Sequence, residues 1–189
     1  MQAKQKTYIA TFIFGEETDT LDATGQVVNT TQNIPNLEDI KGVLPEFIGK
    51  IDQIPPKYSA KSINGKRAYD LARSGVEFEL KPKQVEISKI EIIEYQNATL
   101  KLEIVCGSGT YIRSIGRDIA YKLNSLATMT SLVRTQVGSF SLEKCQDIAK
   151  IDKENIFSNV LPISSVLGYP ILSLSKEEIF KILNGQTII

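Results

Sequence analysis

The chain of 189 residues contains no histidine, only two cysteines, and no apolar run that approaches the roughly 18 residues of a membrane helix. The absence of histidine excludes Ser-His-Asp triads, histidine acid/base pairs and zinc sites with histidine ligands. Cys106 and Cys145 are too few for a four-cysteine metal site and too sparse for a disulfide framework, which favours a reduced, cytoplasmic setting. Any chemistry must therefore use carboxylates, hydroxyls, thiols, lysine or arginine.

An excess of charge of either sign is also absent, because 22 basic residues balance 22 acidic ones. Two stretches depart from this balance, and each has only one acidic residue. The cations of the first, which also holds Tyr58 and Tyr69, are Lys57, Lys61, Lys66, Arg67 and Arg73, and those of the second are Arg113, Arg117, Lys122 and Arg134. Phosphate contacts need local cation density, so these stretches fit either an RNA footprint or solvated surface charge.

Hydrophobic periodicity predicts strands and helices without a regular alternation of the two. The expected strands are Thr7–Phe14, Val85–Tyr95, Thr99–Cys106 and a segment near Thr128–Val137. The expected helices are a segment from Leu37 that kinks or ends early at Pro45, then Lys66–Arg73 and Tyr111–Leu123. Neighbouring long strands joined by a short turn are most simply antiparallel. The sequence therefore predicts an α+β fold with a mixed, mainly antiparallel sheet flanked by helices.

Four segments between Lys6 and Phe140 combine aromatic residues, cations and glycine turns. The first is Lys6-Thr7-Tyr8, followed by Phe14-Gly15 and Thr18-Asp19-Thr20-Leu21-Asp22-Ala23-Thr24-Gly25. The second is Gln53-Ile54-Pro55-Pro56-Lys57-Tyr58-Ser59-Ala60, continued by Asn64-Gly65-Lys66-Arg67-Ala68-Tyr69-Asp70-Leu71-Ala72-Arg73-Ser74-Gly75. The third is Gly109-Thr110-Tyr111-Ile112-Arg113-Ser114, and the fourth is Leu132-Val133-Arg134-Thr135-Gln136-Val137-Gly138-Ser139-Phe140. In this order and at about this spacing, they resemble the TruB-type tRNA pseudouridine synthases.

The resemblance implies a pseudouridine synthase catalytic domain over residues 1–168, with an RNA-binding insertion at about residues 55–80. Residues 169–189 would begin a small C-terminal RNA-binding domain. The implied reaction converts the uridine at position 55, in the T-loop of tRNA, to pseudouridine without a metal or a cofactor. The implied partner is the T-stem-loop of tRNA, and we expect a cytoplasmic monomer with no membrane contact.

The same resemblance assigns roles to single residues. Tyr8 matches the tyrosine that stacks on the flipped uracil and moves its proton, Arg113 matches the arginine that pairs with the nucleophilic carboxylate, and Tyr111 and Leu132 match pocket walls. Asp22 matches a second pocket aspartate. The expected RNA contacts of the insertion are Lys57, Tyr58, Lys61, Lys66, Arg67, Tyr69 and Arg73. From the residues alone, Tyr8 fits a half-buried strand aromatic, Leu132 plain core and Asp22 an Asx-type turn.

The family's nucleophilic aspartate lies upstream of the Tyr8 strand in a G-x-L-D-P-x-A-T-G loop, and these 189 residues contain no such loop. Thr20–Gly25 reads like a shortened copy, but Gly15 and Thr18-Asp19-Thr20 before it assign it to the family's later loop. We therefore expect a chain truncated at the N-terminus and at the C-terminus, and inactive alone. The alternatives are a non-catalytic tRNA-binding module and an incomplete gene product.

Overall fold

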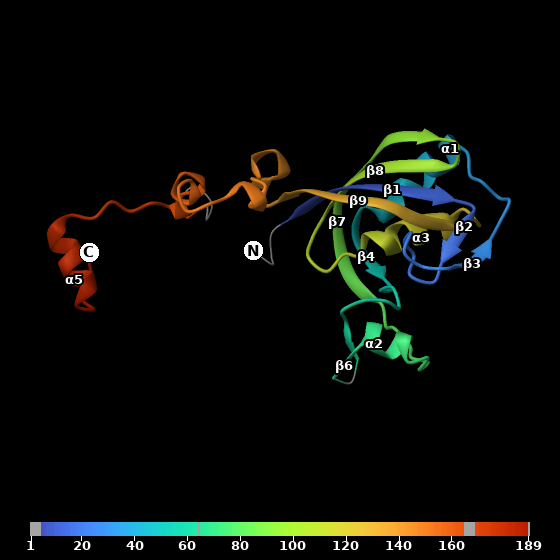
Figure 1. The fold of residues 1–189 in the computed structure, drawn as a ribbon, viewed down its shortest axis with the longest axis horizontal. Coiled ribbons are helices and arrows are strands. Elements are labelled where there is room, and N and C mark those ends of the chain that lie inside the picture. The colour runs from blue at the N-terminus through green and yellow to red at the C-terminus, as the bar shows by residue number, and fades with distance from the viewer. Residues whose placement is uncertain (1–4, 64, 165–168, 189) are drawn as a thin grey trace. The chain divides into compact units, whose positions relative to one another are not determined.

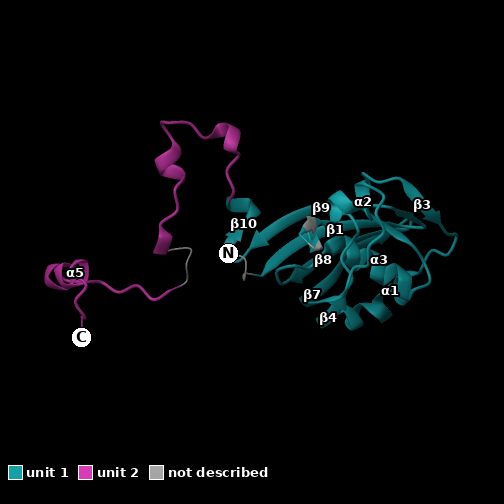
Figure 2. Cartoon of the chain, turned by 90° about the horizontal axis from the view of Figure 1, so that it is seen from below, with its two compact units in different colours: residues 1–144 teal, residues 145–189 magenta. Residues whose placement is uncertain are grey.

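The computed structural model describes residues 5–63, 65–164 and 169–188. The chain divides into two compact units, unit 1 with residues 1–144 and unit 2 with residues 145–189 (Figure 2). Unit 1 holds all the site residues expected from the sequence. The domain boundary expected at residue 168 falls on a residue outside the described part, so it stays a prediction.

Unit 1 is built on a six-stranded sheet with the strand order β10-β9-β1-β8-β7-β4 (Figure 1). All ladders between these strands are antiparallel. Their bounds are β1 Lys6–Phe14, β4 Gly49–Gln53, β7 Lys83–Gln96, β8 Thr99–Cys106, β9 Ala127–Val137 and β10 Phe140–Ser141. The four strands expected from periodicity are thus confirmed as β1, β7, β8 and β9, and the α+β class is confirmed with them.

The helices expected from the sequence lie close to the observed ones. These are α1 Leu37–Val43, followed directly by the 3₁₀ helix η1 Leu44–Phe47, then α2 Ala68–Arg73 and α3 Ile112–Lys122. The 3₁₀ helix η2 Leu142–Lys144 was not expected. The helix from Leu37 does end early, because Pro45 lies in the first turn of η1 and cannot continue the α-helical ladder. The expected helix Lys66–Arg73 was wrong at its start, because residues 66 and 67 form a strand.

Two short antiparallel pairs complete unit 1. β2 (Glu16–Thr18) pairs with β3 (Val27–Thr30), and β5 (Ser62–Ile63) pairs with β6 (Lys66–Arg67). The first pair brackets the loop that contains Asp22, and the second lies within the insertion together with α2. In Figure 1, α2 and β6 extend away from the six-stranded sheet.

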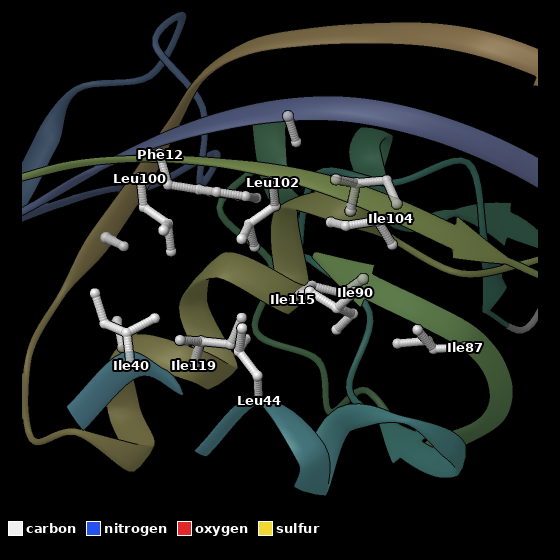
Figure 3. Packing of buried hydrophobic residues seen from close by; sticks show 14 of the residues in the cluster. Phe12, Ile40, Leu44, Ile87, Ile90, Leu100, Leu102, Ile104, Ile115 and Ile119 are labelled. Atoms are coloured by element: carbon white, nitrogen blue, oxygen red, sulfur yellow. The ribbon is translucent and has the colours of Figure 1, made fainter. Parts of the chain in front are cut away.

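The core lies between one face of the sheet and the helices α1 and α3. Figure 3 shows Leu100, Leu102 and Ile104 of β8 reaching toward Ile115 and Ile119 of α3, and all five side chains are buried. Ile40 of α1 and Leu44 of η1 close the cluster from below in the same view. The buried residues alternate along β8 and recur at helical spacing along α3. Burial of this apolar surface fixes α3 against the sheet.

α3 lies close against the sheet at Gly116. A Cβ atom at this position would lie 2.2 Å from the Phe12 ring of β1, so only glycine fits there. The absence of a side chain at residue 116 therefore allows α3 to pack directly on the Phe12 ring.

Unit 2 has less regular structure. It contains the 3₁₀ helices η3 (Ile148–Lys150) and η4 (Ile156–Asn159) and the helix α5 (Lys176–Leu183), which Ser175 and Glu178 cap reciprocally. None of its described large apolar side chains is buried. Across the described residues of the whole chain, no helix is long and apolar enough to cross a membrane.

Candidate active site

Arg113, in the first turn of α3, joins three segments that are distant in sequence. Its Nη1 atom donates to Asp22 Oδ2 at 2.9 Å and to the Thr20 carbonyl at 2.7 Å. Its Nη2 atom donates to the Tyr58 carbonyl at 2.8 Å. The planar guanidinium group can satisfy several acceptors at fixed angles, which a lysine cannot do. Arg113 therefore ties the loop that contains Asp22 and the start of the insertion to one point of α3.

Asp22 is bonded through both carboxylate oxygens. While Oδ2 accepts from Arg113, Oδ1 accepts from Thr20 Oγ1 at 2.8 Å, from Thr24 Oγ1 at 2.5 Å and from the Thr24 amide at 3.1 Å. The Thr24 amide contact is the Asx-type turn that the residues alone suggested. Asp22 is thus both a turn residue and the ion-pair partner of Arg113.

These contacts determine the charge on Asp22. Burial alone would raise the pKa of its carboxyl, but the hydrogen bonds from Thr24 and Thr20 and the charge of Arg113 together lower the pKa below its ordinary value. The carboxylate is therefore ionised at neutral pH and held in one orientation. Thr20 and Thr24 were not expected as site residues. Their positions, two residues before and two residues after Asp22, could have indicated them.

The backbone around Asp22 is anchored on β9. The Ala23 amide donates to the Met129 carbonyl at 3.0 Å, and the Met129 amide donates to the Leu21 carbonyl at 3.1 Å. Leu21 itself has φ of 61°, a left-handed conformation that is uncommon for a residue other than glycine, and its side chain is buried. Strain of this kind persists only where surrounding contacts determine the conformation, as they do here.

Tyr8 and Leu132 lie on the face of the sheet that carries the core. Tyr8 is opposite Arg134 across the β1–β9 ladder, and Leu132 is opposite Ala10, which is buried on that face. Cross-strand partners share a face, so Tyr8 and Leu132 point to the same side as α3. Tyr8 is half-buried, as a strand aromatic would be, but Leu132 is 42% exposed and so is not plain core.

Tyr111 is the residue immediately before α3 and therefore its N-cap. Its main chain is bonded to Gln53, whose side-chain Nε2 donates to the Tyr111 carbonyl at 3.1 Å and whose Oε1 accepts from the Tyr111 amide at 2.8 Å. Gln53 was quoted in the sequence motif but was not expected as a site residue. Its position directly before Ile54-Pro55-Pro56 is the sequence feature that could have indicated it.

The aromatic residues of the insertion contact one another. The rings of Tyr58 and Tyr69 meet edge to face with centroids 6.1 Å apart, and the Arg73 guanidinium lies 4.6 Å from the Tyr69 centroid. Lys61 Nζ donates to the Lys81 carbonyl at 3.2 Å. The remaining expected cations are Lys57 and Arg67, which are exposed, and Lys66, whose side chain lies outside the described part.

A groove of about 1040 Å³ lies between the insertion and the rest of unit 1. Leu21 lines it from the Asp22 side, Tyr58 and Phe78 from the insertion, and Arg117 from α3. Arg117 Nη2 also donates to the Ile54 carbonyl at 2.8 Å. The insertion therefore contacts α3 at its root, while the groove separates residues 72–80 from the Asp22 side.

We next considered side chains that could ligate a metal ion, among the described residues. Their cysteine, aspartate and glutamate side chains form no group of three or more that could hold a metal ion. The structure brings together an oriented carboxylate and an arginine with three acceptors, and it places a half-buried tyrosine, Tyr8, on the sheet face that carries the core. These groups suit proton transfer and the stabilisation of an ionised carboxylate.

Comparison with known proteins gives this arrangement a family. Residues 1–112 match the TruB family pseudouridylate synthase (N terminal domain). The chain is 43% identical over 188 residues to tRNA pseudouridine synthase B of Borreliella afzelii (strain PKo), covering 97% of this chain and 64% of that protein. It is 41% identical over 191 residues to tRNA pseudouridine synthase B of Mycoplasma mobile, covering 100% of this chain and 63% of that protein.

Among solved structures, the chain is similar to one described as a Cbf5-Nop10-Gar1 complex, with a TM-score of 0.56 at 23% identity over 79% of this chain and 35% of that one. This likeness supports the fold alone. The chain spans just under two thirds of the length of the curated relatives named above. The family match, which covers more than half of the 189 residues, shows that the chain belongs to the TruB pseudouridylate synthase family.

Proposed function

We propose that this chain is the larger part of an enzyme that isomerises the uridine at position 55, in the T-loop of tRNA, to pseudouridine. The observation that carries the proposal is the Asp22–Arg113 ion pair, which is joined through the Tyr58 carbonyl to the start of the insertion. The relatives called tRNA pseudouridine synthase B support the reaction and the class of substrate.

The proposed reaction exchanges one bond of the nucleoside for another. The bond between N1 of uracil and C1′ of the ribose breaks, the uracil turns, and a bond forms between C5 and C1′. C5 loses a proton and N1 gains one, so the atoms and electrons balance without an oxidant, a reductant or a metal. The protein has to supply a nucleophilic carboxylate, a base near C5 and a pocket for a base taken out of the stack.

The described residues can fill most of these roles. Tyr8 offers a ring face for the uracil and a phenolic oxygen for the C5 proton, and Tyr111 and Leu132 offer walls for the same pocket. Arg113 is suited to keep a carboxylate ionised, as its contact with Asp22 illustrates. The nucleophile is assigned to an aspartate of the family's G-x-L-D-P-x-A-T-G loop rather than to Asp22, whose oxygens already accept hydrogen bonds from its neighbours.

A turnover assay tests the reaction. The chain should form no pseudouridine in a T-stem-loop RNA, and activity should appear when a segment with the G-x-L-D-P-x-A-T-G loop is joined upstream. In that longer protein, Tyr8→Phe should keep RNA binding and lose product, because the ring remains and the phenolic oxygen is removed. Turnover by the chain alone that Asp22→Asn abolishes and Asp19→Asn preserves would identify Asp22 as the nucleophile and contradict this assignment.

The insertion is proposed as the principal RNA-docking element. It combines five cations with two tyrosines, a composition suited to phosphate contact and to stacking on exposed bases. The triple variant of Lys61, Lys66 and Arg67 to alanine should weaken binding of a T-stem-loop RNA at all salt concentrations. Each lost phosphate contact should also flatten the dependence of log K on log salt by about 0.7 to 0.9.

The matched control replaces three cations of unit 1 outside the insertion, namely Lys41, Lys101 and Lys144. This variant has the same change in net charge, so it should reproduce only the general loss of electrostatic attraction. If the two triple variants bind with the same affinity and the same salt slope, the docking surface lies elsewhere, and Arg117, Lys122 and Arg134 are the alternative to test. RNA binding without turnover in the longer protein would favour a non-catalytic tRNA-binding module.

A further inference from the structure

Gln53 is a polar side chain that is buried at the end of a strand. It is the last residue of β4, and it is 1% exposed. A buried amide is costly unless its donors and its acceptor are satisfied. Both polar atoms of the Gln53 amide are bonded to Tyr111, since Nε2 donates to the Tyr111 carbonyl and Oε1 accepts from the Tyr111 amide. The two bonds copy the pairing of neighbouring strands, with a side-chain amide in place of a peptide.

These bonds hold a helix start that has no capping side chain of its own. Tyr111, the N-cap of α3, makes no side-chain capping bond, and its carbonyl accepts only a long bond of 3.3 Å from Ile115 within the helix. The Gln53 amide therefore supplies the short contacts at this corner. Arg113 follows two residues later, so the same corner determines where its guanidinium group leaves the helix.

The residues after Gln53 strengthen the connection to α3. The Ile54 carbonyl accepts from Ser114 Oγ at 3.0 Å and from Arg117 Nη2 at 2.8 Å. Pro55 and Pro56, both fully buried, restrict the backbone and bring no N–H groups that would need partners. The root of the insertion is thus fixed on the first two turns of α3, with Gln53 as its first contact.

We propose that Gln53 is a positioning residue, whose side-chain amide fixes the main chain of Tyr111 and so sets how Tyr111 and Arg113 present themselves to the target base. The inference rests on the proposed function, because it assigns Gln53 to the pocket in which the uridine is held. It predicts that the loss of this amide changes recognition of the base more than it changes phosphate-driven binding or stability.

Two variants separate positioning from folding. Gln53→Met keeps the length and the unbranched shape of the side chain and removes both hydrogen bonds. Gln53→Glu keeps the shape too, but its carboxylate can only accept a bond, whereas its neutral acid form can also donate one to the Tyr111 carbonyl. Gln84→Met, at an exposed position of β7 opposite Asp52, is the matched control.

The measurement compares two T-stem-loop RNAs, one with the target uridine and one with an abasic site in its place. The parent chain should bind the uridine RNA about tenfold more tightly, the size expected when one base is stacked in a pocket. Gln53→Met should lower this ratio below about threefold and leave the affinity for the abasic RNA within about twofold of the parent. Gln84→Met should keep the parent ratio.

A pH series adds a readout that a merely structural residue would not give. The ratio for Gln53→Glu should be low at pH 8 and rise toward that of the parent as the pH is lowered, because protonation restores the missing donor. Gln53→Met should stay low throughout. Hydrogen exchange should show faster exchange of the Tyr111 amide in Gln53→Met, with the Ile119 amide, inside the core, unchanged.

The outcomes separate this inference from the proposed function. A parent chain that binds both RNAs equally would overturn the proposed base pocket, and the inference with it, before any variant is compared. A parent that discriminates, together with a Gln53→Met variant that discriminates equally well, would overturn the inference alone. So would equal acceleration of exchange at Tyr111 and Ile119, because Gln53 would then support the whole fold rather than this corner.

Discussion

Helix α5 has the better local signals for helix formation, but helix α3 is the better packed of the two. α5 has a complete capping box at Ser175 and Glu178, whereas α3 has no side-chain cap. Yet Ile119 of α3 is completely buried, and Phe180 of α5 is 68% exposed. Good caps and apolar residues make a helix, but most of its stability in a protein comes from the surface that packs against it. Unit 1 provides such a surface for α3, and the described part of unit 2 provides none for α5.

The largest effect should come from removing a core side chain of α3. Ile119→Ala should lower the free energy of unfolding of unit 1 by about 3 kcal/mol, because it removes buried apolar contact and leaves a cavity beneath the sheet. Chemical denaturation followed by circular dichroism would measure the change. A loss below about 1 kcal/mol would mean that α3 is no better packed than α5, and the comparison would fail.

The next effect concerns Arg113, which joins the core helix to two loops. Arg113→Ala should cost about 2 kcal/mol, less than a fully buried pair would, because both members are partly exposed. It removes the donor to Asp22 Oδ2 and to the Thr20 and Tyr58 carbonyls, while Asp22 Oδ1 keeps its bonds from Thr20 and Thr24. Arg113→Lys should recover only part of the loss, since one ammonium group cannot reach all three acceptors. If alanine and lysine variants were both as stable as the parent, Arg113 would not organise these loops.

Much of unit 1 could be predicted from sequence because its elements repeat a simple pattern. The alternation in Thr99–Cys106 and the helical spacing of Ile112, Ile115 and Ile119 both predict the faces that are buried. β4 was not expected, because its inward positions hold Ile51 and Gln53, and a glutamine hides the alternation. β6 was missed because its partner β5 makes it a strand, and pairing of this kind is not visible in the local sequence.

The site was accessible only in part. The resemblance selected Asp22 and Arg113 separately and gave Arg113 another carboxylate as partner, while the structure places the two side chains 2.9 Å apart across 91 positions of sequence. The Gln53–Tyr111 contact spans 58 positions and joins a side chain to a main chain. Every residue has the same main-chain carbonyl, and every residue except proline has the same amide, so neither the motif nor the composition could reveal that Gln53 bonds to Tyr111.

A smaller change in stability should follow from lowering the pH, and it should have opposite signs at two aspartates of unit 1. The pKa of Asp22 is lowered in the folded protein, so its contribution to stability is present above the unfolded value and is lost as the pH falls through the folded one. Burial raises the pKa of Asp118 despite the nearby Arg117, so protonation of Asp118 favours the folded state instead.

Denaturation from pH 6 down to pH 3 would measure this difference. Relative to the parent, Asp22→Asn should lose less stability on acidification, because the group that weakens has been removed. Asp118→Asn should show the reverse, with a steeper decline than the parent. Each effect should be smaller than that of Arg113→Ala, since only a proton is exchanged. Two variants with the same pH dependence would contradict the opposite signs.

The smallest effect is expected in unit 2. Phe180→Ala removes a large apolar side chain that is mostly exposed, so no cavity forms and little buried surface is lost. The free energy of unfolding of unit 1 should change by less than about 0.5 kcal/mol, as for most surface substitutions. Local helicity of α5 should rise slightly, because alanine has the higher helix propensity.

The matched change in unit 1 is Phe12→Ala, beneath Gly116, which should cost several times more. If Phe180→Ala instead lowered stability by more than about 1 kcal/mol, a surface would pack against α5 in solution, and the contrast with α3 would be one of degree only.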